Sequence, residues 1–195
     1  MGKMVKNVLG ILGSPRRHGK VGTLLDKVLE EAAAGGHTVE LVHLYDLDIR
    51  YCRGCMACRS AGRCGMGDDL DPLARKITAA DVVVLAAPTY WANVPAIVKN
   101  LFDRIVGYVA ESPKGRGLRP RLSRNQEYVL ITACTSPSPV NVLFRQSSGA
   151  LRSMDMVFRA AGMRRRGTVT LAGTRDLEQI PARIVAQARR LGRMI

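Results

Sequence analysis

The chain has 195 residues, of which 47% are apolar, and its 30 Lys and Arg residues against 16 Asp and Glu give a formal net charge of +14. At this length a domain buries roughly 70% of the surface that its unfolded chain exposes, so neither disulfides nor a structural metal are needed to hold a core together. The longest clean apolar run, Val82 to Ala87, is far shorter than the ~20 residues that cross a bilayer, and no segment has the layout of a secretory signal. We therefore expect one cytoplasmic domain, residues 1–195, with no membrane partner.

Apolar, β-branched runs alternate with amphipathic stretches along the whole chain. Strands are predicted at residues 5–12, 38–44, 81–87, 127–134 and 167–172. Apolar residues spaced at i, i+3, i+4 and i+7 predict helices at residues 21–35, 69–79, 94–109, 141–161 and 176–194. The run at 82–87 shows no alternation, which is typical of a strand buried on both faces. This order predicts an α/β fold with a doubly wound, five-stranded parallel sheet in the flavodoxin-like order 2-1-3-4-5.

In such a fold, ligands bind outside the carboxyl ends of the strands. The loop after the first strand, residues 13–23, is rich in glycine and hydroxyl groups, and Arg16 and Lys20 add positive charge. It leads into a helix, whose unpaired N–H groups and positive dipole end suit a phosphate. The loop matches neither the Walker pattern nor the dinucleotide fingerprint GxGxxG. Taken alone, it is explained equally well as an ordinary polar turn.

The loop after the third strand, residues 88–96, carries the only Trp of the chain, Trp91, next to Tyr90. Aromatic side chains at a strand end are suited to line a planar ring, whose polar edge the loop backbone can read. Without the neighbouring phosphate-type loop, the simpler interpretation is that Trp91 covers the core.

Four of the five cysteines fall within thirteen residues. They are Cys52, Cys55, Cys58 and Cys64. A [4Fe–4S] cluster needs four converging thiolates, and a Cys-x-x-Cys-x-x-Cys run supplies three of them from one loop, whereas zinc usually takes two separated pairs. Three alternatives stay open: a cluster, zinc, or free thiols without a metal. We expect Cys134 to be inert packing in a strand, and Asp68 to be the N-cap of the helix that follows the cysteines.

Two strand-end loops and the cysteine run resemble one family, the NAD(P)H-dependent FMN reductases of the flavodoxin-like fold, and the cysteines are similar to those of its iron-sulfur flavoprotein branch. The resemblance extends over most of the chain and weakens after about residue 140. The residues that carry it are Gly13-Ser14-Pro15-Arg16, Pro88-Thr89-Tyr90-Trp91, Pro95-Ala96, Lys99, Phe102-Asp103-Arg104, the four cysteines and Asp68-Asp69.

The resemblance implies an FMN cofactor, NAD(P)H as electron donor, and a homodimer or homotetramer. The FMN phosphate would be held by Ser14, Arg16 and the backbone of Gly19, Lys20, Val21, Gly22 and Thr23. The isoalloxazine ring would be flanked by Pro88, Thr89, Tyr90, Trp91, Ala92, Asn93, Thr132, Ala133 and Thr135. The cysteines would hold the metal. The chain departs from its relatives at Lys20-Val21, where they tend to have Asn-Thr, and at Ala133-Cys134, where they often carry two glycines.

Positive charge is concentrated in residues 111–195, which hold 16 basic and 5 acidic residues, against 14 and 11 in residues 1–110. Part of this excess lies in the long connection 111–125, which we interpret either as a lid or interface element or as a solvated crossover. Its cations are Lys114, Arg116, Arg119, Arg121 and Arg124. One hypothesis assigns Arg116 and Arg119 to the 2′-phosphate of NADPH.

Three functions are compatible with the sequence. The first is an FMN-dependent NAD(P)H oxidoreductase that acts on free flavin, a quinone or another small acceptor. The second is an electron carrier whose cluster exchanges electrons with a ferredoxin. The third, a basic nucleic-acid-associated protein, is disfavoured because no DNA- or RNA-binding motif accompanies the charge. No catalytic side chain is assigned, since His18, His37 and His43 are expected to be surface or structural residues.

Overall fold

Five parallel strands form one sheet in the order β2-β1-β3-β6-β7, which confirms the predicted order 2-1-3-4-5. The structure is a computed structural model that describes residues 4–111 and 117–195. The strands of the sheet are β1 (Asn7–Leu12), β2 (Thr38–His43), β3 (Val82–Pro88), β6 (Glu127–Ala133) and β7 (Arg164–Leu171). Two short strands, β4 (Ala110–Glu111) and β5 (Arg119–Pro120), pair with each other outside it.

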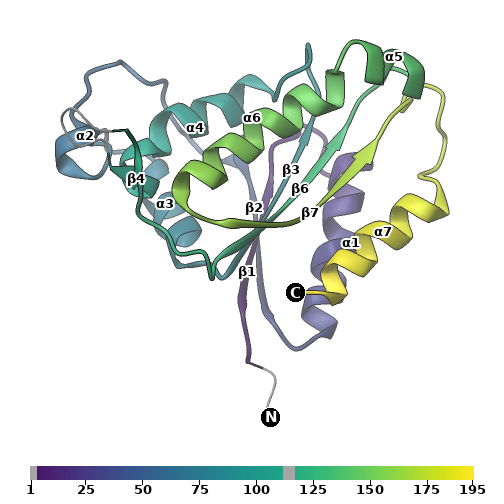
Figure 1. The fold of residues 1–195 in the computed structure, drawn as a ribbon, viewed down its shortest axis with the longest axis horizontal. Coiled ribbons are helices and arrows are strands. Elements are labelled where there is room, and N and C mark those ends of the chain that lie inside the picture. Colours follow the sequence, from purple (N-terminus) through teal and green to yellow (C-terminus); the bar gives the residue numbers. More distant parts are fainter. Residues whose placement is uncertain (1–3, 112–116) are drawn as a thin grey trace.

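The helices lie on both faces of the sheet (Figure 1), with α1 and α7 on one face and α3, α4 and α6 on the other. They are α1 (Lys20–Ala34), α2 (Cys58–Ala61), α3 (Leu70–Ala79), α4 (Ala96–Val109), α5 (Ser138–Leu143), α6 (Gln146–Ala161), α7 (Ala182–Arg193) and a 3-10 turn, η1 (Leu44–Asp46). No helix in the described part of the chain is long and apolar enough to span a bilayer.

The two layers of helices explain why β3 has no alternating pattern. Val82, Val84 and Ala86 pack toward α1 and α7. The residues between them, Val83 and Leu85, pack toward α3, α4 and α6. Both faces of this central strand are therefore apolar, and full burial of each such valine or leucine contributes about 1.5–3 kcal/mol.

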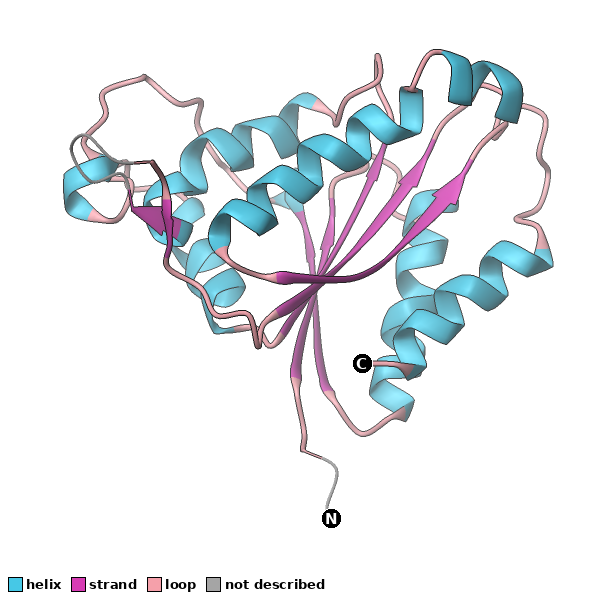
Figure 2. Ribbon diagram, viewed as in Figure 1, coloured by secondary structure: helices cyan, strands magenta, loops and turns pink. Residues whose placement is uncertain are grey.

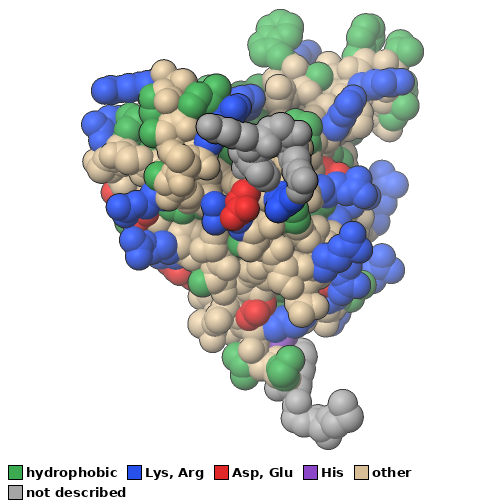
Figure 3. Space-filling view, turned by 60° about the vertical axis from the view of Figure 1, so that its left-hand side comes forward, with side chains coloured by type: hydrophobic (Ala, Val, Ile, Leu, Met, Phe, Trp, Pro, Cys, Tyr) green, Lys and Arg blue, Asp and Glu red, His purple; other side chains and the backbone are tan. Residues whose placement is uncertain are grey.

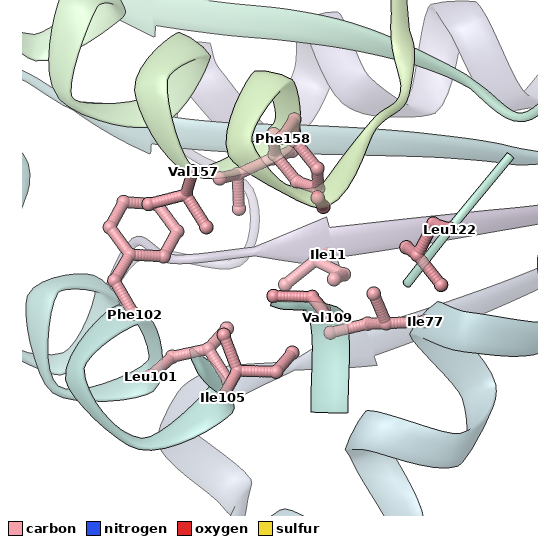
Figure 4. Close-up of a pocket in the computed structure, with 11 residues that line it drawn as sticks. Ile11, Ile77, Leu101, Phe102, Ile105, Val109, Leu122, Val157 and Phe158 are labelled. Carbon is pink, nitrogen blue, oxygen red and sulfur yellow. The ribbon is translucent and has the colours of Figure 1, made fainter. Parts of the chain in front are cut away.

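A small void remains between the sheet and the helices α4 and α6 (Figure 4). Its volume is about 10 Å³, and every side chain around it is apolar. Ile105 of α4 and Phe158 of α6 point toward it from opposite sides. A void of this size without polar partners stays dry, so it is a packing defect and not a ligand site.

Two predicted helices differ from the observed ones. The predicted helix 141–161 is broken, because Arg145 adopts a left-handed conformation with φ of 50°, which separates α5 from α6. The Asn141 side chain accepts the Ser147 N–H at 2.8 Å and so caps the second of these helices. The last helix begins at Ala182 instead of residue 176, because a proline, Pro181, stands directly before the helix. The residue that precedes a proline favours an extended conformation, which prevents an earlier start.

All five strands point the same way, so their carboxyl ends meet at one edge of the sheet, to which the arrowheads in Figure 2 point. The loops 13–19, 89–95, 134–137 and 172–181 all start at this edge.

Candidate functional site

A cleft of about 790 Å³ opens at the carboxyl ends of β1, β3, β6 and β7. Clefts of this size hold cofactors and small substrates. The residues that line it are Ser14, Pro15, Arg16, His18, Gly19, Lys20, Val21, Thr23, Pro88, Thr89, Tyr90, Ala133, Thr135, Thr174, Arg175, Glu178, Gln179, Ile180 and Val185. Sequence-predicted residues from three separate loops are thus brought together in one cleft.

The first wall of the cleft is the amino terminus of α1 and the loop before it. α1 begins after Gly19 with no side chain capping its first N–H groups and no acidic residue in its first turn. Such N–H groups have no partner within the helix, and with the helix dipole they attract an anion. Within the described residues the side chains of Arg16 and Lys20 form no ion pair and line the cleft, whereas Arg17 is paired with Asp46.

Gly22 does not line the cleft but shapes this wall from behind. A Cβ added at Gly22 would lie 1.9 Å from the carbonyl oxygen of Arg17, so only glycine lets the loop fold this closely onto the helix. The start of the loop is fixed as well, since the Gly13 N–H donates to the carbonyl of Ala86 on β3 at 2.8 Å.

His43, at the end of β2, braces the same loop from the side. Its Nε2 atom donates to the Ser14 carbonyl oxygen at 2.6 Å, and its Nδ1 atom lies 3.3 Å from Asp46 Oδ1. Asp46 also accepts a hydrogen bond from Arg17. The bond from Arg17, followed by the one from His43, holds the pKa of Asp46 below its usual 3.8. His43 is buried and joins the Ser14 end of the loop to Asp46 of the turn η1, while Arg17 joins the other part of the loop to the same carboxylate.

The second wall comes from the loops after β3 and β6. Pro88, Thr89, Tyr90, Ala133 and Thr135 line the cleft. Thr132 lies behind them: it is fully buried, and its hydroxyl is hydrogen-bonded to the Thr89 hydroxyl at 2.9 Å. The Thr89 N–H also donates to the Ala133 carbonyl at 2.8 Å, so the two loops are joined.

Trp91, Ala92 and Asn93 form the rim of the cleft instead of its wall. Trp91 and Ala92 both have positive φ, 52° and 57°, in a tight turn that Tyr90 and Asn93 close by mutual backbone hydrogen bonds. The Trp91 side chain is 101% exposed, so it does not cover the core.

The third wall, which is the segment between β7 and α7, is not among the residues predicted from the sequence. Thr174, Arg175, Glu178, Gln179, Ile180 and Val185 line the cleft. A signal was present, because this segment directly follows a predicted strand and thus begins at the same edge. The predicted helix from residue 176 places most of this segment in a helix instead of in a loop at the cleft.

The hypothesis that Arg116 and Arg119 hold a 2′-phosphate gains no support from their positions. Arg119 belongs to β5, which pairs with β4 beyond the carboxyl end of α4, at the edge of the sheet opposite the cleft. Arg116 and Lys114 lie outside the described residues.

The four cysteines lie on a separate loop that packs against α4. Cys52 and Cys55 are exposed, and Cys58 and Cys64 are half-buried. Within residues 4–111 and 117–195, no group of three or more His, Cys, Asp or Glu side chains is close enough to hold a metal ion. Cys134 is buried immediately after β6, as expected of a packing residue.

A groove of about 670 Å³ lies between the cysteine loop and the amino-terminal part of α4. Tyr51 and Cys52 line it on the side of the cysteine loop, and Ala96 and Ile97 of α4 line it on the other. Tyr45 lines it too, and burial, followed by the proximity of Tyr90 of the cleft, raises the Tyr45 pKa above its usual 10.0.

The prediction that Asp68 is the N-cap of α3 is wrong. The helix begins at Leu70, and Asp69 occupies the N-cap position. Asp68 does accept the Leu70 N–H at 3.2 Å, but its carboxylate is also held by the buried Arg104 of α4.

The fold and the cleft define the class: a flavodoxin-like α/β protein in which an uncapped helix terminus opens into a cleft at the edge of the sheet. A family model described as NADPH-dependent FMN reductase matches residues 6–121, and the chain belongs to this family. The resemblance inferred from the strand-end loops is confirmed.

Curated relatives with the name iron-sulfur flavoprotein match part of the chain. One from Archaeoglobus fulgidus is 43% identical over 100 residues, which cover 51% of this chain and 46% of that protein. Iron-sulfur flavoprotein MJ1083 from Methanocaldococcus jannaschii is 34% identical over 122 residues, which cover 60% of this chain and 63% of that protein. In both cases the match spans less than two thirds of the relative's own length.

Solved structures share the fold over nearly the whole chain. The NAD(P)H:quinone oxidoreductase from Methanothermobacter marburgensis has a TM-score of 0.76 and 19% identity, with 97% of this chain and 98% of that chain covered. The azoreductase AzrA has a TM-score of 0.74 and 18% identity, with 97% and 100% covered. At these identities the likeness shows the fold alone.

Proposed function

We propose that this chain is an FMN-dependent oxidoreductase that takes a hydride from NADPH or NADH and passes the electrons to a small acceptor such as free flavin or a quinone. The observation that carries the proposal is the uncapped amino terminus of α1, which opens into the cleft beside the unpaired Arg16 and Lys20. Bound FMN would supply the redox chemistry, because a flavin accepts a hydride and releases electrons one or two at a time.

The residues of the first wall fit a phosphate. The N–H groups of residues 20–22 would donate to its oxygens, since the Thr23 N–H already donates to the Gly19 carbonyl, and Arg16 would add a charge-assisted hydrogen bond. Lys20 replaces the Asn of the relatives with a positive charge. Thr23 lines the cleft and supplies the hydroxyl that Val21 lacks.

The second wall suits the flat ring of the cofactor. Pro88, Tyr90 and Ala133 present apolar surface to the cleft, and Thr89 adds a polar group. The departure at Ala133-Cys134 leaves the cleft open, since the Cys134 side chain is buried and lies 3.5 Å from the Ser136 carbonyl oxygen. These residues would orient the ring and exclude water from one of its faces.

An anaerobic titration tests this function. We expect FMN to bind, and NADPH or NADH to bleach the visible absorbance of the bound flavin. Arg16→Gln should weaken FMN binding about tenfold through the loss of a charged hydrogen bond, while Arg59→Gln, on an exposed residue of the cysteine loop, serves as the control. No flavin binding, or bound flavin that neither nicotinamide reduces, would overturn the proposal.

A second candidate function is electron transfer through a [4Fe–4S] cluster to a ferredoxin-type partner. Four thiols in one loop are a suitable donor set, and relatives that match part of the chain are named iron-sulfur flavoproteins. Arg53, Arg59 and Arg63 would offset the negative charge of four thiolates. Figure 3 shows many Lys and Arg and few Asp and Glu side chains on the side of the molecule that carries α2. The sulfurs do not converge in the arrangement described, so we derive no step through the cluster.

Iron, zinc and acid-labile sulfide, measured in protein purified without oxygen, distinguish the three open alternatives for the cysteines. Iron and sulfide in a 1:1 ratio that Cys55→Ser abolishes would support the cluster. Bound zinc, or neither metal, would reject it.

We also propose a homodimer or homotetramer. Trp91 and three side chains at the end of α5, Val142, Leu143 and Phe144, are exposed and apolar. The turn that carries Trp91 touches α6, since a Cβ added at Gly149 would lie 2.1 Å from the Ala92 carbonyl oxygen. Exposed apolar groups beside a cleft are typical of an interface, and sedimentation of wild type and Phe144→Ser would test it.

A further inference from the structure

The cysteine loop is closed at its base by its own ends. The Arg50 N–H donates to Asp68 Oδ2 at 3.1 Å, and the Arg50 guanidinium donates to the Gly67 carbonyl at 2.8 Å. One step further out, Asp48 and Asp69 are joined by two hydrogen bonds, of 2.8 and 3.2 Å. All four cysteines therefore lie inside one closed loop, residues 50–68.

Arg104 of α4 lies beneath this closure and contacts both ends of the loop. It is 2% exposed, and its guanidinium donates to both carboxylate oxygens of Asp68, at 2.9 and 3.1 Å. It also donates to the Arg50 carbonyl oxygen. One turn earlier on the same helix, the Asn100 side chain donates to the Ile49 carbonyl at 2.8 Å. Residues spaced by four lie on one face of a helix, so α4 presents two donors to the base of the loop.

The same guanidinium contacts one of the cysteines. Its Nε atom lies 3.2 Å from Cys64 Sγ, in hydrogen-bond contact with the sulfur. Cys52 and Cys55, by contrast, are exposed, and no hydrogen bond of their sulfurs is found in the described residues. Among these three cysteines, Cys64 is therefore the one whose sulfur α4 holds by a hydrogen bond.

The buried ion pair between Arg104 and Asp68 is costly to separate. The side chains of Arg104 and Asp68 are both 1% exposed, and a buried charge that loses its partner is strongly destabilising. Burial opposes the charged form of Asp68, yet the hydrogen bonds from Arg104 and from the backbone of Leu70 and Arg50 outweigh it and hold the Asp68 pKa below its usual 3.8.

A backbone contact keeps the middle of the loop on the same helix. A Cβ added at Gly107 of α4 would lie 2.7 Å from the Cys58 carbonyl oxygen and 3.2 Å from the Arg63 nitrogen. The same added Cβ would lie 3.0 Å from the Cys58 Cβ, so the helix touches the loop at Cys58 as well as next to Cys64.

We propose that Arg104 is a positioning residue that closes the cysteine loop at its base and fixes the Cys64 sulfur before any metal binds. If the loop takes a metal, Cys64 would be a ligand that is already in place, and the exposed Cys52 and Cys55 would be the thiols that move to join it. The closure is a property of the metal-free protein, and only the use of the thiols as metal ligands rests on the proposed function.

Hydrogen exchange of the metal-free protein tests the closure, with Arg104→Lys as the variant and Arg183→Lys, on an exposed residue of α7, as the matched control. Lysine keeps the charge but cannot bond Asp68 in a bidentate way and reach Cys64 as well. We expect the amides of residues 50 and 67–70 to exchange about tenfold faster in Arg104→Lys, with those of β1 and β3 unchanged. Unchanged exchange at the base of the loop would overturn the proposal.

If Arg104→Lys fails to fold, hydrogen exchange is measured on the double variant Arg104→Gln with Asp68→Asn, which removes both buried charges together. A titration with zinc ion alone then gives an independent readout. Zinc should bind the wild type and Arg183→Lys equally, and Arg104→Lys about tenfold more weakly; equal zinc affinity in all three would contradict the positioning role. If zinc does not bind even the wild type, the metal function of the thiols fails, while the exchange data still decide whether Arg104 closes the loop.

Discussion

Gly22 provides the sharpest perturbation of the phosphate-type loop. It lies in the first turn of α1, where helix propensity alone predicts that Gly22→Ala stabilises the protein by about 1 kcal/mol. We expect the opposite. A Cβ at this position would lie 1.9 Å from the Arg17 carbonyl oxygen, whereas ordinary contact begins at 3.4 Å. Because the obstacle is backbone, the loop itself must move, at a cost of about 1–3 kcal/mol.

The displaced loop no longer presents Ser14 and Arg16 to the phosphate together with the amino terminus of α1. A cost of about 2 kcal/mol corresponds to roughly 30-fold weaker FMN binding, measured by quenching of flavin fluorescence. Gly65→Ala is the matched control, since a Cβ there meets nothing within 4 Å. Unchanged FMN affinity in a folded Gly22→Ala protein would refute the reasoning that this close backbone contact shapes the site.

Three further predictions concern single side chains. His43→Leu removes the hydrogen bond to the Ser14 carbonyl and should weaken FMN about fivefold, with binding of riboflavin less affected; equal loss for both ligands would count against the brace. Burial first, and the hydrogen bond to Asp71 second, raise the pKa of Tyr108 to about 12, so its neutral form stabilises the fold fully below pH 10.0 and this contribution is lost as pH rises toward 12. The urea midpoint of wild type should therefore fall more steeply than that of Tyr108→Phe between these pH values, and parallel curves would contradict this. Trp91→Ala should leave the free energy of unfolding of the monomer within about 0.5 kcal/mol of wild type, since the side chain is fully exposed, while self-association weakens. A large loss of stability would show that Trp91 packs on the core after all.

The sheet and two walls of the cleft were predictable because their signals are local. The unbroken apolar run Val82 to Ala87 indicates a strand covered on both sides. Because crossovers between parallel strands are almost always right-handed, few strand orders remain possible. Once the order is known, the carboxyl ends of neighbouring strands must meet, which places residues 13–23 and 88–93 at one edge.

The remaining features depend on contacts between distant residues. Arg145 in a left-handed conformation is set by the Asn141 cap and by the packing of Gly149 against Ala92, and a helical period in the sequence does not reveal either. The position of Asp68 before a helix predicts a cap, whereas its partner, Arg104, lies on another element and is visible only in three dimensions. Local pattern predicts elements, and it does not predict which buried charges face each other.

The central claim is that the amino terminus of α1 and its loop hold the phosphate of FMN. Parallel titrations of the protein with FMN and with riboflavin, which lacks only that phosphate, test it most directly. We expect FMN to bind about 100-fold more tightly, as several charge-assisted hydrogen bonds would give. Equal affinity for the two flavins, or binding of neither, would contradict the account.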